Sequence, residues 1–437
     1  MKTFLATLVF SFVLLQSQAQ TLIRWDFERE DGTHTLFPTF ISDTSAMDVN
    51  DVRYSALYPL DGNAVPGVSG QPFDWADAVR GWYPDSSIHT YIWTWIEFRF
   101  FVDSDFVASV DSISLWYKRD MVGPTRFDFR SHKDLYGSAI DAILLDELDV
   151  SWHKWSIPVS PFLVNGYEQV TFRIYGDGAP SHNEGYFTID SVAIYGSIFR
   201  AQPLNLRAYL GGPFSESLPP QKDDLRSLGF LPIIDPYGSG KITTPEVLAI
   251  SDDNAIVDWV LVEIRSADDS ANVVSSVSAL LQKDGDIVNV DGVSSPVVGL
   301  DSGQYYIAVR HRNHLGVMTA SAINLSGGAS TIDFTSTATA TYGSSAQVQV
   351  GTKMLLWAGD ATGNGTIKYT GSGNDRDPII LAIGGTTPNN TVSNVYDRRD
   401  TNLDGVIKYT GSGNDRDIIL TNVGSTTPNN TRTQQLP

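Results

Sequence analysis

The sequence predicts a mainly β protein, in which two β-sandwiches precede a small module with short helices. Three observations favour this fold class. Apolar and polar residues alternate with a period of two over many short stretches, of which residues 93–102, 170–175 and 255–265 are clear examples. Glycine, proline, asparagine and aspartate separate these stretches, as expected for turns between antiparallel strands. Amphipathic helical pattern is scarce, and before the C-terminal region only residues 139–149 suggest a short helix.

The N-terminus predicts a secretory signal peptide over residues 1–19. A single lysine, Lys2, precedes an apolar run at residues 4–15, and the run is followed by Ser17-Gln18-Ala19. The run is too short to span a bilayer comfortably, and no later stretch approaches the required length. We therefore expect a secreted protein, extracellular or on the cell surface, without a transmembrane segment once the signal is removed.

The composition is acidic and lacks cysteine. The formal net charge of the 437-residue chain is −20. This balance argues against binding to nucleic acid, which needs a basic face to neutralise phosphates. It suits a protein that binds divalent cations, or one that is merely soluble. Without disulfides, the stability of a secreted chain must come from apolar cores or from bound ions.

Residues 20–200 are predicted to form a jelly-roll-like β-sandwich. Residues 188–196 resemble the last strand of secreted jelly-roll domains of the carbohydrate-binding type. Aromatic side chains beside loops stack on sugar rings through their apolar faces, and packing in the core or at the rim is the alternative role. The candidate glycan contacts are Trp75, Trp82, Tyr83, Trp152 and Trp155.

Residues 203–350 are predicted to form a second, immunoglobulin-like β-sandwich with a proline-rich, ordered loop at 211–245. His311 and His314 stand three residues apart, and on a strand this spacing places the two rings on opposite faces. We therefore expect a structural or solvent-facing pair rather than half of a zinc site. Four further polar residues around a short strand are expected to form turns rather than to bind calcium. They are Asp284, Asp286, Asn289 and Asp291.

Residues 351–437 contain a tandem duplication with a specific chemical pattern. Residues 367–377 recur letter for letter as residues 407–417. An acidic run precedes each copy: Asp360-Ala-Thr-Gly-Asn-Gly365 and Asp400-Thr-Asn-Leu-Asp-Gly405. Calcium takes six to eight oxygen ligands, and a loop can present them at alternate positions around a glycine that turns the chain sharply. Each copy therefore predicts one Ca²⁺ site, and two turns that bind nothing are the alternative.

The predicted ligands are alternate side chains of each run, followed by one backbone carbonyl. In the first copy they are Asp360, Thr362, Asn364 and the carbonyl of Thr366. In the second they are Asp400, Asn402, Asp404 and the carbonyl of Val406. The second run has more carboxylates, so we expect the site over residues 400–417 to bind calcium more tightly.

The acid that closes each calcium loop is displaced toward the C-terminus. Glycine occupies the twelfth position, where a standard loop has a carboxylate, and two later acids compete for the closing role. A short helix is expected to follow, with Asn374 or Asn414 as its N-cap. The competing acids are Asp375 and Asp377 in the first copy and Asp415 and Asp417 in the second.

The repeat resembles the type I dockerin module, a calcium loop of Asp-x-Asn-x-Asp-Gly type followed by one helix and present twice. The resemblance covers residues 351–437 and departs from the family at the inserted Tyr-Thr-Gly-Ser-Gly-Asn. It implies docking to a cohesin-like or cell-surface partner, with Lys368-Tyr369 and Lys408-Tyr409 as contacts or as local packing. Residues 203–437 also look like the C-terminal region of bacterial secreted proteins labelled haemagglutinin-like, which implies adhesion.

These observations predict a secreted, modular, calcium-binding protein for surface adhesion, glycan binding or docking, and not an enzyme. No nucleophile elbow, Walker loop or dinucleotide-binding glycine motif follows a strand, and carboxylate pairs are too numerous to single one out. A polysaccharide-active hydrolase with its site in the N-terminal domain is the first alternative. A structural matrix or surface protein is the second.

Overall fold

The structure, a computed structural model, divides the chain into two compact units, and the boundary in the sequence follows Ala201. We call them the N-terminal unit and the C-terminal unit (Gln202–Pro437). The predicted signal peptide lies outside the described residues, among which no helix is long and apolar enough to cross a membrane. The described residues are 20–27, 38, 40–42, 44–50, 53–55, 58–59, 65–66, 75–80, 95–132, 136, 138–146, 149–165, 169–177, 186–217 and 219–437.

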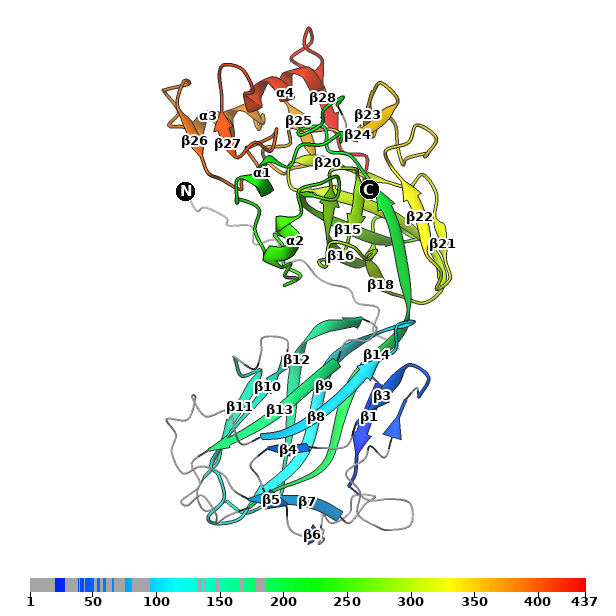
Figure 1. The fold of residues 1–437 in the computed structure, drawn as a ribbon, viewed down its shortest axis with the longest axis vertical. Helices are drawn as coiled ribbons and strands as arrows, with labels where there is room; N and C mark the ends of the chain where they lie inside the picture. Colours follow the sequence, from blue (N-terminus) through cyan, green and yellow to red (C-terminus); the bar gives the residue numbers. More distant parts are fainter. Residues whose placement is uncertain are drawn as a thin grey trace, which may run out of the picture. The chain divides into compact units, whose positions relative to one another are not determined.

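The N-terminal unit is a β-sandwich of two antiparallel sheets (Figure 1). The first sheet has the order β12 (His153–Asn165), β9 (Phe106–Arg119) and β14 (Phe187–Arg207), and β14 also pairs with β1 (Gln20–Trp25) and β7 (Trp75–Arg80). Short strands extend this sheet: β2 (Phe40–Ile41), β5 (Tyr58–Pro59) and β6 (Val65–Pro66). The second sheet has the order β11 (Asp141–Leu144), β10 (Arg126–Ser131), β13 (Gln169–Asp177), β8 (Trp95–Val102) and β3 (Met47–Val49), with β4 (Arg53–Ser55) on β8.

Apolar side chains from both sheets meet in one core between them. Phe127 and Phe187, one from each sheet, stack with ring centroids 3.9 Å apart. Trp25 and Phe98 meet edge to face at 5.4 Å. The alternation in the sequence therefore gave the correct buried faces, and the predicted β-sandwich is confirmed. Residues 139–149, whose pattern suggested a short helix, instead contain strand β11, which pairs along β10.

The C-terminal unit is built on one hydrogen-bonded sheet. Residues 204–207 of β14 pair with β17 (Asp286–Val288) and, in parallel, with β22 (Ser330–Asp333). The order continues through β16 (Val273–Gln282), β15 (Ile256–Ser266), β19 (Gly303–His311) and β20 (His314–Met318). β18 (Val297–Gly299) pairs with β14, and β21 (Ile323–Leu325) with β19. This single sheet differs from the two facing sheets that an immunoglobulin-like sandwich predicts.

The proline-rich segment explains the difference, because it covers β15 where a second sheet was expected. Nearly every residue of β15 is buried, on both faces. The Trp259 Nε1–H donates to the carbonyl of Pro232 at 2.8 Å, and the Tyr237 hydroxyl donates to the carbonyl of Trp259 at 3.2 Å. Two short helices, α1 (Asp224–Ser227) and α2 (Pro245–Ala249), lie in the segment and at its end.

The repeat belongs to the same compact unit as the sheet and is not a separate domain after residue 350. A hairpin of β23 (Gln347–Val350) and β24 (Lys353–Leu356) precedes it. The first copy gives β25 (Thr366–Lys368), α3 (Arg376–Ala382) and β26 (Thr391–Ser393), and the second gives β27 (Val406–Lys408), α4 (Asp415–Val423) and β28 (Thr431–Thr433). β25 pairs with β28 and β26 with β27, so the copies interlock (Figure 1).

Candidate calcium loops

The two predicted calcium loops have the same backbone form. The fourth and sixth residues of each run have positive φ angles, 70° and 78° at Gly363 and Gly365, and 60° and 79° at Leu403 and Gly405. Side chains other than glycine rarely adopt this conformation, so Leu403 is strained. Its side chain is 2% exposed and packs in the core of the C-terminal unit, which offsets the strain.

The first aspartate of each run organises its loop from the inside. Asp360 accepts hydrogen bonds from the backbone N–H groups of Asn364 (3.0 Å) and Gly365 (2.8 Å). Asp400 accepts the corresponding bonds from Asp404 (3.1 Å) and Gly405 (2.8 Å). Both carboxylates are buried. The side chain at the first position therefore fixes the turn on which the other oxygens are carried.

Asp375 and Asp415 face the loops from the opposite side. The Asp375 carboxylate accepts from the backbone N–H groups of Thr362 (3.0 Å) and Lys368 (2.8 Å). Asp415 accepts from Thr401 (2.6 Å) and Lys408 (2.8 Å). The Thr362 hydroxyl lies 3.2 Å from Asp360 Oδ1 and 2.9 Å from Asp375 Oδ1, so the two carboxylates converge on one point.

The competing acids Asp377 and Asp417 point elsewhere. Their side chains are more than half exposed. Each accepts a hydrogen bond of 2.8 Å from an asparagine side chain, Asn374 or Asn414, whose oxygen in turn accepts from the backbone N–H of Asp377 or Asp417. At α4 this reciprocal pair caps the helix, with Asn414 as the N-cap. At α3 the same pair forms, but the N-cap is Asp375, so the expected N-cap Asn374 lies one residue too early. The geometry therefore assigns Asp377 and Asp417 to the caps and brings Asp375 and Asp415 to the loops.

The inserted segment explains how a late acid reaches the loop. Two glycines with positive φ, Gly371 and Gly373, fold the segment back on itself. The Lys368 amine donates to the carbonyl of Ser372 at 2.9 Å, and Lys408 makes the same bond to Ser412 at 2.7 Å. Arg376 and Arg416 lie over the rings of Tyr369 and Tyr409. Local packing therefore accounts for the Lys-Tyr pairs that the dockerin resemblance offered as partner contacts.

The loop carboxylates form no ion pair among the described residues, although the charge of Arg312 acts on Asp400. Other buried acids are paired with arginine, for example Glu97 with Arg173 and Glu263 with Arg265. Within the described part of the chain, no ion pair involves the carboxylates of the two loops, which are Asp360, Asp375, Asp400, Asp404 and Asp415. Burial raises the pKa of Asp375 to about 6 and that of Asp415 to about 7. Burial and the neighbouring Asp415 raise the pKa of Asp400 to about 8.

The remaining predicted ligands lie on the rims of the loops. Asn364 Oδ1 accepts from the backbone N–H of Thr366 at 2.8 Å, and Asp404 Oδ1 from that of Val406 at 2.9 Å. The Asn402 amide lies 3.0 Å from Asp404 Oδ2. Among the described residues, no three His, Cys, Asp or Glu side chains by themselves form a metal-binding group. An ion here would therefore also need the amide, hydroxyl and carbonyl oxygens.

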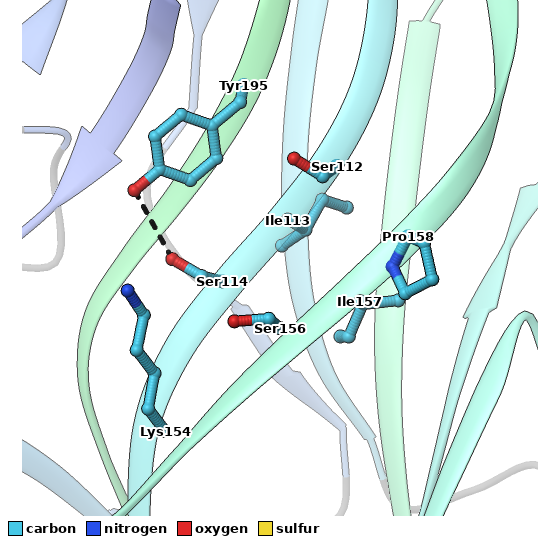
Figure 2. Close-up of a pocket in the computed structure, with 8 residues that line it drawn as sticks. All are labelled: Ser112, Ile113, Ser114, Lys154, Ser156, Ile157, Pro158 and Tyr195. Atoms are coloured by element: carbon cyan, nitrogen blue, oxygen red, sulfur yellow. Dashed lines mark hydrogen bonds between the residues drawn. The ribbon is translucent and has the colours of Figure 1, made fainter. Parts of the chain in front are cut away.

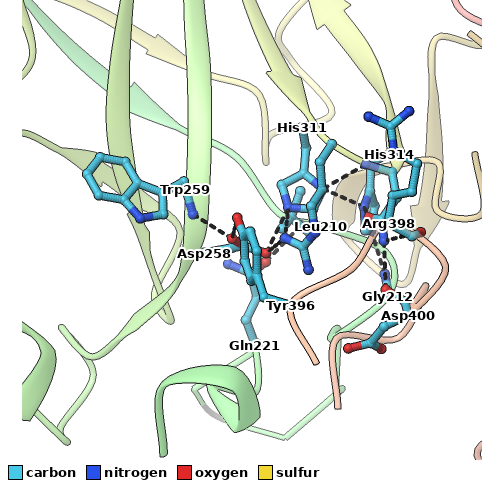
Figure 3. Close-up of polar contacts among 12 residues, drawn as sticks. Leu210, Gly212, Gln221, Asp258, Trp259, His311, His314, Tyr396, Arg398 and Asp400 are labelled. Atoms are coloured by element: carbon cyan, nitrogen blue, oxygen red, sulfur yellow. Dashed lines mark hydrogen bonds and ion pairs between the residues drawn. The ribbon is translucent and has the colours of Figure 1, made fainter. Parts of the chain in front are cut away.

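A buried polar network anchors the second loop to the sheet (Figure 3). The Asn313 side-chain amide donates to the backbone carbonyls of Arg398 (3.0 Å) and Asp400 (2.6 Å). The Tyr396 hydroxyl donates to the Asp258 carboxylate at 2.7 Å, and Arg312 forms an ion pair with the same carboxylate. Residues ahead of the loop are thereby held against β15.

His311 and His314 belong to this network, and their predicted placement on opposite faces is wrong. They face each other across the β19–β20 hairpin, with Nδ1 atoms 2.9 Å apart. The Gly212 N–H donates to His314 Nε2 at 2.9 Å, and His311 Nε2 lies 3.0 Å from Asp258. The prediction failed because the strand ends at His311 and the chain reverses within the spacing of three. Because these bonds engage both nitrogens of each ring, the pair is structural rather than half of a zinc site.

The candidate glycan contacts divide into three groups. Trp155 is 4% exposed, and its indole N–H donates to Asp141 at 2.8 Å, so the alternative of core packing holds for it. Trp152 is half-buried, with the Lys118 amine 4.7 Å from its ring centre. The backbone of Trp75 lies in β7, whereas the side chain of Trp75 and the whole of Trp82 and Tyr83 lie outside the described residues.

A hollow on the outer face of the first sheet was not predicted. It measures about 260 Å³ and lies across β9, β12 and β14 (Figure 2). Ser112, Ser114 and Ser156 contribute hydroxyls, Lys154 an amine and Tyr195 a ring. Serine carries no marked sequence signal, and only the register brings these strands together, with Ser114 opposite Ser156 and Ser112 opposite Tyr195.

No family model matches the chain, and no curated protein matches its sequence. Three solved domains are similar in structure. The CBM22-1 xylan-binding domain of Paenibacillus barcinonensis Xyn10C is 12% identical, with a TM-score of 0.22 over 41% of this chain and 95% of that domain. The mannohexaose-bound CBM27-1 of Caldicellulosiruptor saccharolyticus is 13% identical, with a TM-score of 0.22 over 40% of this chain and 95% of that domain. The K1 cleaved adhesin domain of Porphyromonas gingivalis Lys-gingipain is 11% identical, with a TM-score of 0.21 over 34% of this chain and 96% of that domain. With such scores, no property of these domains transfers to this chain.

Proposed function

We propose that this chain is a non-catalytic, secreted calcium-binding protein, and that two calcium ions stabilise its C-terminal unit. One observation carries the proposal: two equivalent loops each bring buried carboxylates together, and among the described residues no ion pair offsets their charge. Elsewhere in the chain, arginine neutralises buried acids such as Glu97 and Glu263. A divalent cation supplies the missing charge and favours the ionised form of carboxyls whose pKa burial has raised.

The residues present fit calcium. Oxygen atoms dominate the set, which calcium prefers over the nitrogen and sulfur ligands typical of zinc. Asp360, Thr362, Asn364, the Thr366 carbonyl and Asp375 would hold the first ion. Asp400, Asn402, Asp404, the Val406 carbonyl and Asp415 would hold the second. We expect the second site to be tighter because its acidic run supplies two aspartates, Asp400 and Asp404, where the first run supplies one.

Calorimetric titration of residues 20–437 with calcium tests this proposal. We expect two binding events, of which Asp404→Ala removes the tighter. Asp284→Ala, which removes an acid outside the loops, is the matched control and should leave both events in place. A titration without heat, together with an unchanged melting temperature in calcium, would refute calcium binding.

Glycan binding by the N-terminal unit is a second candidate function, favoured by the hollow on its first sheet. Hydroxyl groups, the Lys154 amine and the Tyr195 ring together match the polar edges and apolar faces of sugars. None of the residues that line the hollow is Asp or Glu, so it offers no acid–base pair for glycoside hydrolysis.

A glycan array with wild-type protein and Tyr195→Ala tests this second function. We expect Tyr195→Ala to lose binding to the glycans that the wild type binds. Tyr305→Ala, which changes a tyrosine of the C-terminal unit, should still bind them. An array on which the wild type retains nothing would favour the alternative of a structural matrix or surface protein. A cohesin-like partner remains a proposal from the dockerin resemblance alone.

A further inference from the structure

A third stretch of the chain has the spacing of the two calcium loops. Asp235-Pro-Tyr-Gly-Ser-Gly-Lys-Ile242 shares its first aspartate, sixth glycine and eighth isoleucine with the runs that begin at Asp360 and Asp400. The likeness continues into the helix: Pro245-Glu-Val-Leu-Ala-Ile250 corresponds to Pro378-Ile-Ile-Leu-Ala-Ile383. The third stretch lacks only the eight residues equivalent to 370–377. That missing segment contains the closing acid, Asp375.

The backbone of this stretch repeats the loop form. Gly238 and Gly240, at the fourth and sixth positions, have φ angles of 84° and 74°. The Asp235 carboxylate accepts from the backbone N–H of the fifth residue, Ser239, at 3.2 Å. Asp360 and Asp400 make the same bond at 3.0 and 3.1 Å. Helix α2 follows, as α3 and α4 follow the other two loops.

A hydroxyl takes the place of the missing acid. The Ser278 Oγ–H, from β16, donates to Asp235 Oδ1 at 2.8 Å, and the Ser239 hydroxyl donates to Ser278 at 3.1 Å. The backbone N–H of Lys241 donates to Asp235 Oδ2 at 3.0 Å. Burial alone would raise the pKa of Asp235, but these hydrogen bonds outweigh burial and lower it. Asp235 thus differs from Asp375, Asp400 and Asp415, whose pKa values are raised.

The third stretch also provides its own strand pairing. The Asp235 N–H donates to the carbonyl of Lys241 at 3.0 Å, and the Thr243 N–H donates to that of Ile233 at 2.9 Å. In the repeat, by contrast, β25 and β27 each pair with a strand from the other copy. This stretch therefore depends on neither a second acid nor a second copy.

We infer that residues 235–250 are a third copy of the calcium-loop unit that holds its fold without an ion. The segment directly before this copy packs against the second calcium loop. A Cβ placed on Gly405 would lie 2.7 Å from the Phe230 ring, so the second loop runs directly against the lead-in to the third stretch. Leu403 shares one apolar cluster with Leu225 and Leu231. The inference rests on the proposed function only in taking the other two loops to bind calcium.

Amide hydrogen exchange of the whole chain, in calcium and after chelation, tests the inference on all three loops at once. On chelation, the amides of Gly365, Lys368, Gly405 and Lys408 should exchange faster by on the order of tenfold or more, because loop opening becomes easier. The amides of Tyr237, Ser239 and Lys241 should keep their protection. The inference would be overturned if the amides of Tyr237, Ser239 and Lys241 lost protection on chelation as strongly as those of the two calcium loops. A third bound calcium ion would also overturn it.

Two variants test directly whether the Ser278 hydroxyl takes the place of the closing acid. Ser278→Ala should increase amide exchange at residues 237–241, while the variant should still bind two calcium ions. Ser276→Ala, on the same strand, is the control and should alter neither the exchange rates nor the number of bound ions. If Ser278→Ala leaves residues 237–241 as protected as the wild type, the hydroxyl does not replace the acid and the inference fails. If chelation changes none of the three loops, the proposed calcium function fails, and the Ser278 comparison still decides the third stretch.

Discussion

Asp415 and Asp417 lie two residues apart yet have different surroundings, which makes them a sharp test of the second site. Asp415 is buried and accepts from the Thr401 N–H of the second loop, whereas Asp417 is exposed and takes part in the cap of α4. We expect Asp415→Asn to weaken the tighter calcium event at least about tenfold, or about 1.4 kcal/mol, because a ligand charge is lost. Asp417→Asn should leave that affinity unchanged, since the cap bond uses its backbone N–H. Calorimetry that finds equal losses would reassign the closing acid.

The buried histidines predict a pH dependence of stability. Burial lowers the pKa of His311 to about 3 and that of His314 well below its usual value. His311 contacts Asp258 and Arg312, and Tyr396 donates to the same Asp258 carboxylate. The unfolded chain takes up these protons below pH 6.5 while the folded chain does not, so stability is present above pH 6.5 and is lost as the pH falls. From pH 7 to 5, His311 alone should lower the unfolding free energy by roughly 2 kcal/mol.

Denaturant titrations at pH 7 and pH 5 in saturating calcium measure this loss. His311→Asn should reduce the difference between the two pH values. His153→Asn, which removes a partly exposed histidine of the N-terminal unit, is the control and should not change it. A C-terminal unit equally stable at both pH values would show that the histidines are not buried and neutral.

Gly405 and Gly373 provide a matched pair of glycines. Both have positive φ, 79° and 69°. A Cβ at Gly405 would meet the Phe230 ring, whereas at Gly373 it would meet nothing within 4 Å. Gly373→Ala should therefore cost only the conformational strain of about 1–2 kcal/mol, and Gly405→Ala clearly more. Thermal melts compare the two, and equal losses would show that the second loop does not pack on Phe230.

At the scale of elements, the interlocked strands predict that the two proposed calcium sites are coupled. Each loop leads into a strand that pairs with a segment of the other copy. The Thr370 hydroxyl donates to Asn429 at 2.7 Å, and Thr410 makes the equivalent bond to Asn389 at 2.9 Å. Order in one copy therefore supports order in the other. We expect Asp400→Asn to reduce calcium affinity at the first loop as well as at its own.

The first loop of the Asp400→Asn variant can be followed by exchange at the Gly365 and Lys368 amides during calcium titration. A shift of their midpoint to higher calcium concentration supports coupling, and Asp284→Asn serves as the control. Midpoints equal to those of the wild type would show two independent sites despite the shared strands.

At the scale of the whole molecule, calcium should stabilise one unit and not the other. Both loops lie in the C-terminal unit. At 100 times the dissociation constant, each ion adds about 2.7 kcal/mol to the stability of the state that binds it. Scanning calorimetry should therefore show a C-terminal transition that falls by roughly 5 °C or more on chelation and an N-terminal transition that stays in place. An N-terminal transition that moves by the same amount would contradict this division.

Much of the architecture could be predicted from alternation and repetition. Period-two patterns such as residues 95–102 gave the N-terminal sandwich because one face of each strand is buried. The repeat gave the two loops and their helices, because ligand spacing and capping asparagines are local signals. Features that depend on residues close together in the sequence could therefore be predicted from it.

What depends on distant partners was not accessible. Nothing near Asp415 distinguishes it from Asp417 until the inserted segment folds back. The third stretch escaped detection because its closing group, Ser278, comes from another strand, although the shared Asp, Gly and Ile spacing was a signal that a search for degenerate copies could have found. His311 and His314 were misplaced because the strand parity was carried through the turn at Arg312 and Asn313, where the chain reverses.

Leu403 belongs to two systems at once. Its backbone, at a φ of 60°, shapes the second loop, while its side chain fills the apolar core of the C-terminal unit. Glycine at this position would relax the backbone and empty part of the core, and a larger side chain would overpack the core. A substitution that eases the loop backbone therefore also alters the apolar core, so loop shape and heat resistance cannot be adjusted separately here.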